Sequence, residues 1–152
     1  MTFKQFAKML EEDLGVEIEM EGDACAFSLG SKEGDNLSLL LQGFDERGMV
    51  LTCADLGEPP PEGREQLFRA LLEANDLYGD TAGATLSLNR QTGQIRLQRY
   101  DDMDALANVG AAKALIAFSD TAAAWQRLIA DFRSGPANGP DDASVPSGMM
   151  MV

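Results

Sequence analysis

The chain of 152 residues has no histidine and only two cysteines. Without histidine, the Ser-His and Cys-His pairs that activate nucleophiles in hydrolases cannot form, nor can zinc sites that need histidine ligands. Basic residues are also scarce, because 12 lysines and arginines face 25 aspartates and glutamates, for a formal net charge of -13. A surface of this charge repels nucleic acid, which is bound through basic patches. We therefore expect no catalytic residues, no metal, no cofactor and no nucleic-acid partner.

Long hydrophobic runs are missing as well. No run approaches the roughly 18 apolar residues that a membrane helix needs. The N-terminal residues 1–15 are amphipathic and have no apolar segment followed by a small-residue cleavage site, so no Sec-type signal peptide is expected. The sequence therefore predicts a cytoplasmic protein without membrane insertion. Its length favours one domain, and 45% hydrophobic residues are enough for a sizeable core.

The two cysteines, Cys25 and Cys53, each lie in an apolar, strand-like run. Two reduced thiols in the core of a cytosolic protein are the expected state. A disulfide remains an alternative if the two strands pair closely enough to meet its geometry.

A first helix is predicted from Thr2, a good N-cap residue, to about Leu14, where Gly15 ends it. Its apolar residues recur every three or four positions and form one stripe. Two interpretations are open. The stripe packs into the core, or its aromatic residues near the chain end, Phe3 and Phe6, line a groove for a partner.

Strand-like segments follow, separated by turn residues. Residues 16–21 alternate apolar and acidic side chains, which fits a short strand or an extended lead-in. The runs 24–29, 37–42 and 49–54 then predict an antiparallel meander, since Gly- and Asp-rich turns join them.

After three prolines, a second helix is predicted from about Pro61 to Leu77. Its apolar face is wider than contact with one sheet requires, so this face either serves the core alone or also forms a dimer contact. Residues 84–88 and 94–98 alternate and predict a hairpin. Its core-facing residues are expected to be Leu86, Leu88, Ile95 and Leu97.

A last helix is predicted over 104–133, with Gly110 loosening its first turns. From Ser134 the composition turns to Gly, Pro, Ser and Asp, which predicts a disordered tail over 134–152 after a domain of residues 1–133. The order α-β-β-β-α-β-β-α predicts a two-layer α+β fold, with helices packed on a twisted, mainly antiparallel sheet.

Several short motifs stand in a fixed order along this pattern. They are Leu56-Gly57 with Pro59, Leu71-Leu72-Glu73-Ala74-Asn75, Tyr78, Gly83-Ala84-Thr85-Leu86 and Trp125. Together with the size, the acidity and the order of elements over residues 2–133, they resemble the class I type III secretion chaperones, the Tir-chaperone-like family. The long tail after Ser134 is a departure from that pattern.

The resemblance implies a small cytoplasmic homodimer that binds the N-terminal segment of a secreted effector protein in extended form and keeps it secretion-competent. It implies no nucleotide. It assigns the dimer interface to Leu67, Phe68, Leu71, Leu72, Ala84 and Leu86. It assigns the effector groove to Phe3, Phe6, Leu10, Phe27, Leu29, Leu39 and Leu41.

Two alternatives accompany this hypothesis. The first is that the same fold serves as an adaptor or regulatory protein-binding module outside secretion. A small hydrolase or metal-dependent enzyme would need two carboxylates held across a cleft or a ligand-spaced cluster. The acidic pairs of this sequence, such as Asp45-Glu46 and Asp101-Asp102, read instead as solvated turns and faces.

Overall fold

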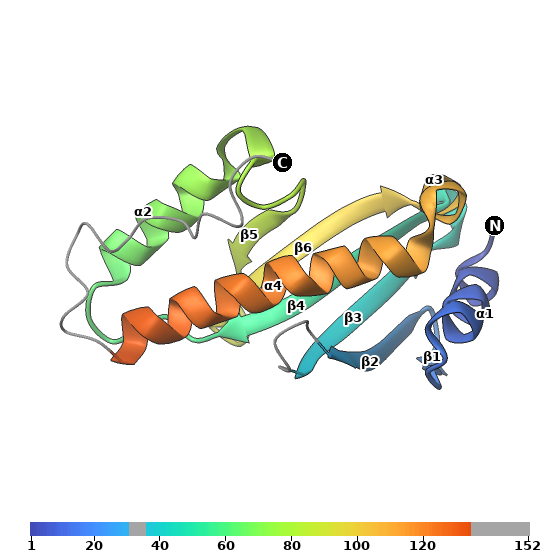
Figure 1. Cartoon of the computed structure of the whole chain (residues 1–152), viewed down its shortest axis with the longest axis horizontal. Coiled ribbons are helices and arrows are strands. Elements are labelled where there is room, and N and C mark those ends of the chain that lie inside the picture. Colours follow the sequence, from blue (N-terminus) through green and yellow to red (C-terminus); the bar gives the residue numbers. More distant parts are fainter. Residues whose placement is uncertain (31–35, 135–152) are drawn as a thin grey trace. The chain divides into compact units, whose positions relative to one another are not determined.

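The computed structural model describes residues 1–30 and 36–134 (Figure 1). The chain folds into two compact units. Unit 1 comprises Met1–Ala54 and Arg99–Asp120, and unit 2 comprises Asp55–Gln98 and the chain from Thr121. Of the predicted tail, residues 135–152 lie outside the described residues, whereas Ser134 is the last residue of a helix.

Helices combined with antiparallel strand pairs make this an α+β fold, which confirms the predicted fold class. In chain order they are α1 (Phe3–Leu14), β1 (Glu19–Glu21), β2 (Ala24–Gly30), β3 (Asn36–Phe44), the 3-10 turn η1 (Asp45–Arg47), β4 (Met49–Gly57), α2 (Arg64–Asn75), the 3-10 turn η2 (Asp76–Tyr78), β5 (Thr85–Leu88), β6 (Ile95–Asp102), α3 (Met103–Val109) and α4 (Ala111–Ser134).

Strands β4 and β6 contribute residues to both units. In unit 1 the strand order is β1-β2-β3-β4-β6, and in unit 2 it is β4-β6-β5. The pairs β1–β2, β2–β3, β3–β4 and β5–β6 are antiparallel. These four pairs join strands that are consecutive in the chain, as the short turns in the sequence predict, whereas β4 and β6 are neighbours that are not consecutive.

Several boundaries differ from the prediction. Strand β4 continues past residue 54 to Gly57, and α2 is shorter than predicted, since it begins at Arg64 and ends at Asn75. The predicted last helix is two helices, because Gly110 adopts φ 100° and ψ 90°, a conformation that L-residues avoid. Residues 16–21, left open as strand or lead-in, contain the short strand β1.

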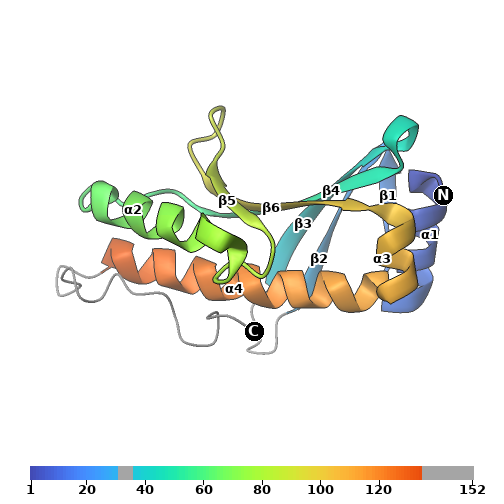
Figure 2. The ribbon, with the colours of Figure 1, turned by 90° about the horizontal axis from the view of Figure 1, so that it is seen from above.

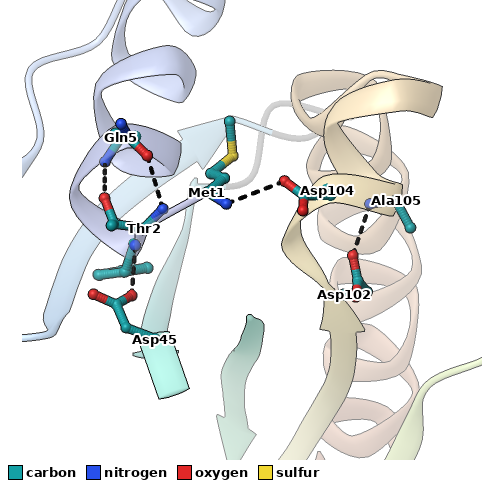
Figure 3. A network of polar contacts seen from close by, with 8 residues as sticks. Met1, Thr2, Gln5, Asp45, Asp102, Asp104 and Ala105 are labelled. Atoms are coloured by element: carbon teal, nitrogen blue, oxygen red, sulfur yellow. Dashed lines mark hydrogen bonds and ion pairs between the residues drawn. The ribbon is translucent and has the colours of Figure 1, made fainter. Parts of the chain in front are cut away.

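The start of α1 is fixed by a network of polar contacts (Figure 3). The Thr2 hydroxyl accepts a hydrogen bond from the Gln5 N–H at 3.2 Å, and the Gln5 side chain accepts one from the Thr2 N–H at 2.9 Å. This capping box satisfies backbone donors that have no partner within the helix. The Asp45 carboxylate accepts a further bond from the Phe3 N–H at 2.6 Å. It comes from η1, so the helix start is attached to the β3–β4 turn.

The same network reaches α3. The N-terminal ammonium lies 3.4 Å from the Asp104 carboxylate, and Asp102 caps α3 by accepting from the Ala105 N–H (Figure 3). The Met103 N–H donates to the Gly48 carbonyl at 2.9 Å. The N-termini of α1 and α3 are therefore both hydrogen-bonded to the β3–β4 turn of unit 1.

Helix α1 packs its whole apolar stripe into the core of unit 1. Phe3, Phe6, Ala7 and Leu10 are all buried. The ring of Phe3 lies on Gly43 of β3, where a Cβ would approach the Phe3 Cγ to 2.2 Å. A glycine is needed at this position because no side chain fits between the strand and the ring.

Gly43→Ala is expected to lower the free energy of unfolding by about 1–3 kcal/mol, the usual cost of forcing an extra methyl group into a packed core. Guanidinium titration followed by circular dichroism measures this loss. Gly30→Ala is the matched control, because the added Cβ in β2 would have only an ordinary contact, 3.7 Å from the Asn36 Oδ1. Equal stability of the two variants would contradict the packing described for Phe3.

In unit 2, α2 is attached to β5 by one side chain. Asn75, the last residue of α2, donates to the Leu86 carbonyl at 2.9 Å and accepts from the Leu86 N–H at 2.8 Å. The indole of the buried Trp125 donates to the Asp80 carbonyl at 3.1 Å. These bonds explain why an Asn and a Trp stand in the motifs identified above. Figure 1 shows α2 alongside β5.

Both cysteines are free and buried, which confirms two reduced core thiols. Cys25 lies opposite Leu41 on β3, whereas Cys53 lies opposite Leu40 from the other side of the same strand. Because Leu40 and Leu41 point to opposite faces of the sheet, the two thiols lie on opposite faces with a strand between them. A disulfide between them is excluded by this geometry.

Burial raises the pKa of the Cys25 thiol from its ordinary 9.0 to about 11. The folded state therefore holds this proton more tightly than the unfolded state. The resulting stability is fully present below pH 9 and is lost as the pH rises toward 11. We expect the free energy of unfolding to fall over this window more steeply in the wild type than in Cys25→Ala. Parallel denaturant titrations measure the difference, and identical slopes would contradict the buried thiol.

Candidate functional site

Helices cover one face of the sheet in unit 1, whereas the other face, here called the open face, carries exposed side chains along β3, although Cys53 of β4 on that face is buried. Along β3, Leu37, Leu39, Leu41 and Gly43 are buried, while the alternate residues are exposed or half-buried. On the covered side, Phe3 of α1 meets Gly43, and Thr52 of β4 lines a small cavity with residues of α3 and α4. Figure 2 shows α1, α3 and the beginning of α4 on that one side of the strands.

The open face carries large apolar side chains. Leu40 is 39% exposed, and the aromatic residues Phe44 and Tyr100 are 36% and 45% exposed. The two rings meet edge to face, with centroids 5.8 Å apart. Met49 lies opposite Phe44 and is half-buried. Exposed apolar residues gathered on one face of a sheet are typical of an interaction surface.

The sheet of unit 1 also has an exposed edge. Strand β1 stands at the end of the strand order, and its residues Glu19–Glu21 are all exposed. An edge strand offers backbone N–H and C=O groups to which an extended peptide can add by hydrogen bonding. The open face and this edge together are the candidate site of unit 1.

The predicted groove residues of unit 1 lie on the covered side. All are buried, between 0% and 9% exposed: Phe3, Phe6, Leu10, Phe27, Leu29, Leu39 and Leu41. The expectation that Phe3 and Phe6 lie at an exposed chain end is wrong, because the capped helix lies flat on the sheet. A direct contact between these side chains and a partner would require the core to open.

Sequence reasoning missed Leu40, Phe44 and Tyr100. The run 37–42 has leucines at both odd and even positions, which point to opposite faces of a strand. Alternation alone therefore does not tell which leucines are buried. Phe44 and Tyr100 stand at strand ends, outside the predicted strands. Alternation gave no signal for Tyr100, because the residue that would continue the apolar series of Ile95 and Leu97 is Arg99.

Unit 2 carries an apolar groove of about 230 Å³ between α2 and the β5–β6 hairpin. Two leucines on its rim are largely exposed: Leu72 at 71% and Leu88 at 52%. Its lining consists of Phe68, Leu71, Leu72, Leu86, Ser87, Leu88 and Ile95. Only one of these residues is polar, so the groove fits an apolar surface.

The structure brings together four of the six predicted dimer residues in this groove: Phe68, Leu71, Leu72 and Leu86. The other two, Leu67 and Ala84, are buried. The prediction that Leu88 faces the core is wrong, because β5 ends at this residue and leaves it exposed. Leu86, Ile95 and Leu97 are buried as expected.

The family model of the Tir chaperone protein (CesT) family matches residues 5–126. The chain belongs to the Tir chaperone protein (CesT) family. The matched range contains both candidate surfaces. It runs from the first turn of α1 to a point within α4 and so includes every strand. A comparison with curated protein sequences finds no match.

Solved structures of similar fold accompany the family match. A chain in the structure of the HopA1-SchA chaperone-effector complex aligns with a TM-score of 0.60 and 17% identity, covering 84% of this chain and 91% of that one. A chain in the crystal structure of the ExsC-ExsE complex aligns with a TM-score of 0.58 and 22% identity, covering 82% and 91%. At these identities the likeness concerns the fold.

Two features are absent from the described part of the chain. Within residues 1–30 and 36–134, no helix is long and apolar enough to cross a membrane. Over the same residues, no three His, Cys, Asp or Glu side chains gather as they would around a metal ion.

Proposed function

We propose that this chain is a type III secretion chaperone. It binds the N-terminal segment of a secreted effector protein in extended form, in the cytoplasm, and keeps it soluble and competent for secretion. Binding, not catalysis, is its activity. The observation that carries the proposal is the open apolar face of unit 1 in a chain of the Tir chaperone protein (CesT) family. Two structures of similar fold, the HopA1-SchA chaperone-effector complex and the ExsC-ExsE complex, support it.

The open face and the β1 edge suit an extended client. Backbone hydrogen bonds at the edge give affinity without demanding a particular side chain at every position. Apolar client side chains then cover Leu40 and the Phe44–Tyr100 pair, which removes apolar area from water. Holding the client extended prevents it from burying the same residues in a fold of its own.

We further propose that two copies form a homodimer through the α2–β5 groove. The support is its apolar lining and the exposure of Leu72 and Leu88, which a partner surface would cover. A dimer presents two client surfaces, and a client that spans both gains affinity through effective concentration. The net charge of -13 keeps such a carrier soluble.

The experiment is co-expression and pull-down of the full chain in its native host, with mass spectrometry of the bound proteins and light scattering of the complex. One dominant secreted protein, held through its N-terminal region, is the expected result. A partner that is never secreted would favour the adaptor alternative instead. Failure to retain any partner would refute the chaperone proposal.

A further inference from the structure

The strand register of unit 1 places charged and apolar groups side by side on the open face. Glu19 lies opposite Ala26, which in turn lies opposite Leu40 on the next strand. One row further along, Glu21 lies opposite Ala24. Across the strands, each of these rows of paired residues therefore has a carboxylate on the edge strand and a small alanine on β2. The first row also includes the exposed Leu40 on β3.

We propose that this face selects a cationic amphipathic segment, in which Lys or Arg residues alternate with apolar ones. The inference rests on the proposed function and names the chemistry of the client segment. Neighbouring strands lie about 4.8 Å apart. A side chain seated over Ala26 thus has Glu19 on one side and Leu40 on the other. Lys and Arg fit this position, because their stems cover apolar surface while their charged ends reach a carboxylate.

The wider charge of the unit favours the same partner. The sequence of unit 1 contains 15 acidic and 6 basic residues, so it carries most of the excess negative charge of the chain. Between Lys8 and Lys32 there are seven acidic residues and no basic one. Such a field accelerates the approach of a cationic segment and disfavours an acidic one.

The Phe44–Tyr100 pair on the open face provides a second attraction for cationic side chains. Phe44 and Tyr100 are exposed and in mutual contact, and the faces of aromatic rings attract Lys and Arg side chains. A neutral apolar segment would use the rings and Leu40 but would leave Glu19 and Glu21 without a partner.

The test is selection of a random displayed peptide library against the immobilised full chain. We expect enrichment of Lys and Arg alternating with apolar residues, and a selected peptide whose affinity falls as ionic strength rises. Glu19→Lys combined with Glu21→Lys is expected to weaken that peptide by more than about tenfold, mainly through its association rate.

The matched control is Glu12→Lys combined with Asp13→Lys. It makes the same change of charge at exposed residues of α1, which lies on the covered side of the sheet. An equal loss of affinity for the selected peptide in both double variants would overturn the inference, because it would show that only the total charge of the chain matters. Selection of neutral or acidic peptides, or of none, would overturn it as well.

The two proposals fail separately. A chain that retains a secreted client in the pull-down but selects neutral peptides keeps the chaperone function and loses the cationic specificity. A chain that selects cationic peptides but retains no secreted protein keeps the surface chemistry and loses the proposed function.

Discussion

Phe6→Asp is expected to unfold the chain rather than to produce a folded protein that has lost its partner. The Phe6 side chain is 0% exposed in the core of unit 1. Removing a buried phenylalanine ring costs about 3–5 kcal/mol, and a carboxylate left in its place adds a desolvation penalty. Because native domains are stable by only about 5–15 kcal/mol, this change consumes most of that margin. Circular dichroism and a denaturant titration measure the loss.

The matched control is Leu40→Asp. This substitution also replaces an apolar residue by a charged one in unit 1, but at an exposed position of the open face. We expect it to keep the wild-type unfolding midpoint to within about 0.5 kcal/mol, as surface substitutions usually do, while weakening client binding. A folded Phe6→Asp protein that specifically lost its client would instead support the groove role predicted for α1.

Leu72→Asp combined with Leu88→Asp is expected to convert the proposed homodimer into monomers. Both leucines are exposed on the rim of the unit 2 groove, so the change costs little in the isolated fold. At an interface, central apolar residues often contribute about 2 kcal/mol or more each. Since 1.4 kcal/mol is a factor of ten, the dissociation constant is expected to rise at least about a hundredfold. Sedimentation velocity over a concentration series measures it.

Leu77→Asp serves as the control for this experiment. Leu77 is 88% exposed in the same unit but does not line the groove. Its backbone has φ 59°, a conformation that aspartate tolerates. The Leu77 variant should dimerise like the wild type. If it dissociates too, or if the Leu72 and Leu88 double variant remains dimeric, the copies meet elsewhere.

Local features were predictable because their causes lie within a few residues. Thr2 and Gly15 bound the first helix as predicted, since a capping hydroxyl and a left-handed glycine act through neighbouring backbone groups. The hairpin at Gly93 followed from the same kind of rule, and Ile95 and Leu97 are buried as the alternation predicts. The ordered motifs from Leu56 to Trp125 were enough to identify the family, which the family model confirms.

Only the tertiary structure decided which apolar residues are left exposed. Leu39 and Leu40 are chemically identical and adjacent. Leu39 is buried and Leu40 is exposed only because α1, α3 and α4 cover one side of β3. The Asp45 cap on α1 and the contact of Phe3 with Gly43 join residues about forty positions apart, which no local pattern encodes. Local sequence patterns were thus sufficient for the fold class, most of the elements and the family. The packing of helices on one side of the sheet decided the surface that faces a partner, because burial depends on the neighbours that the whole fold supplies.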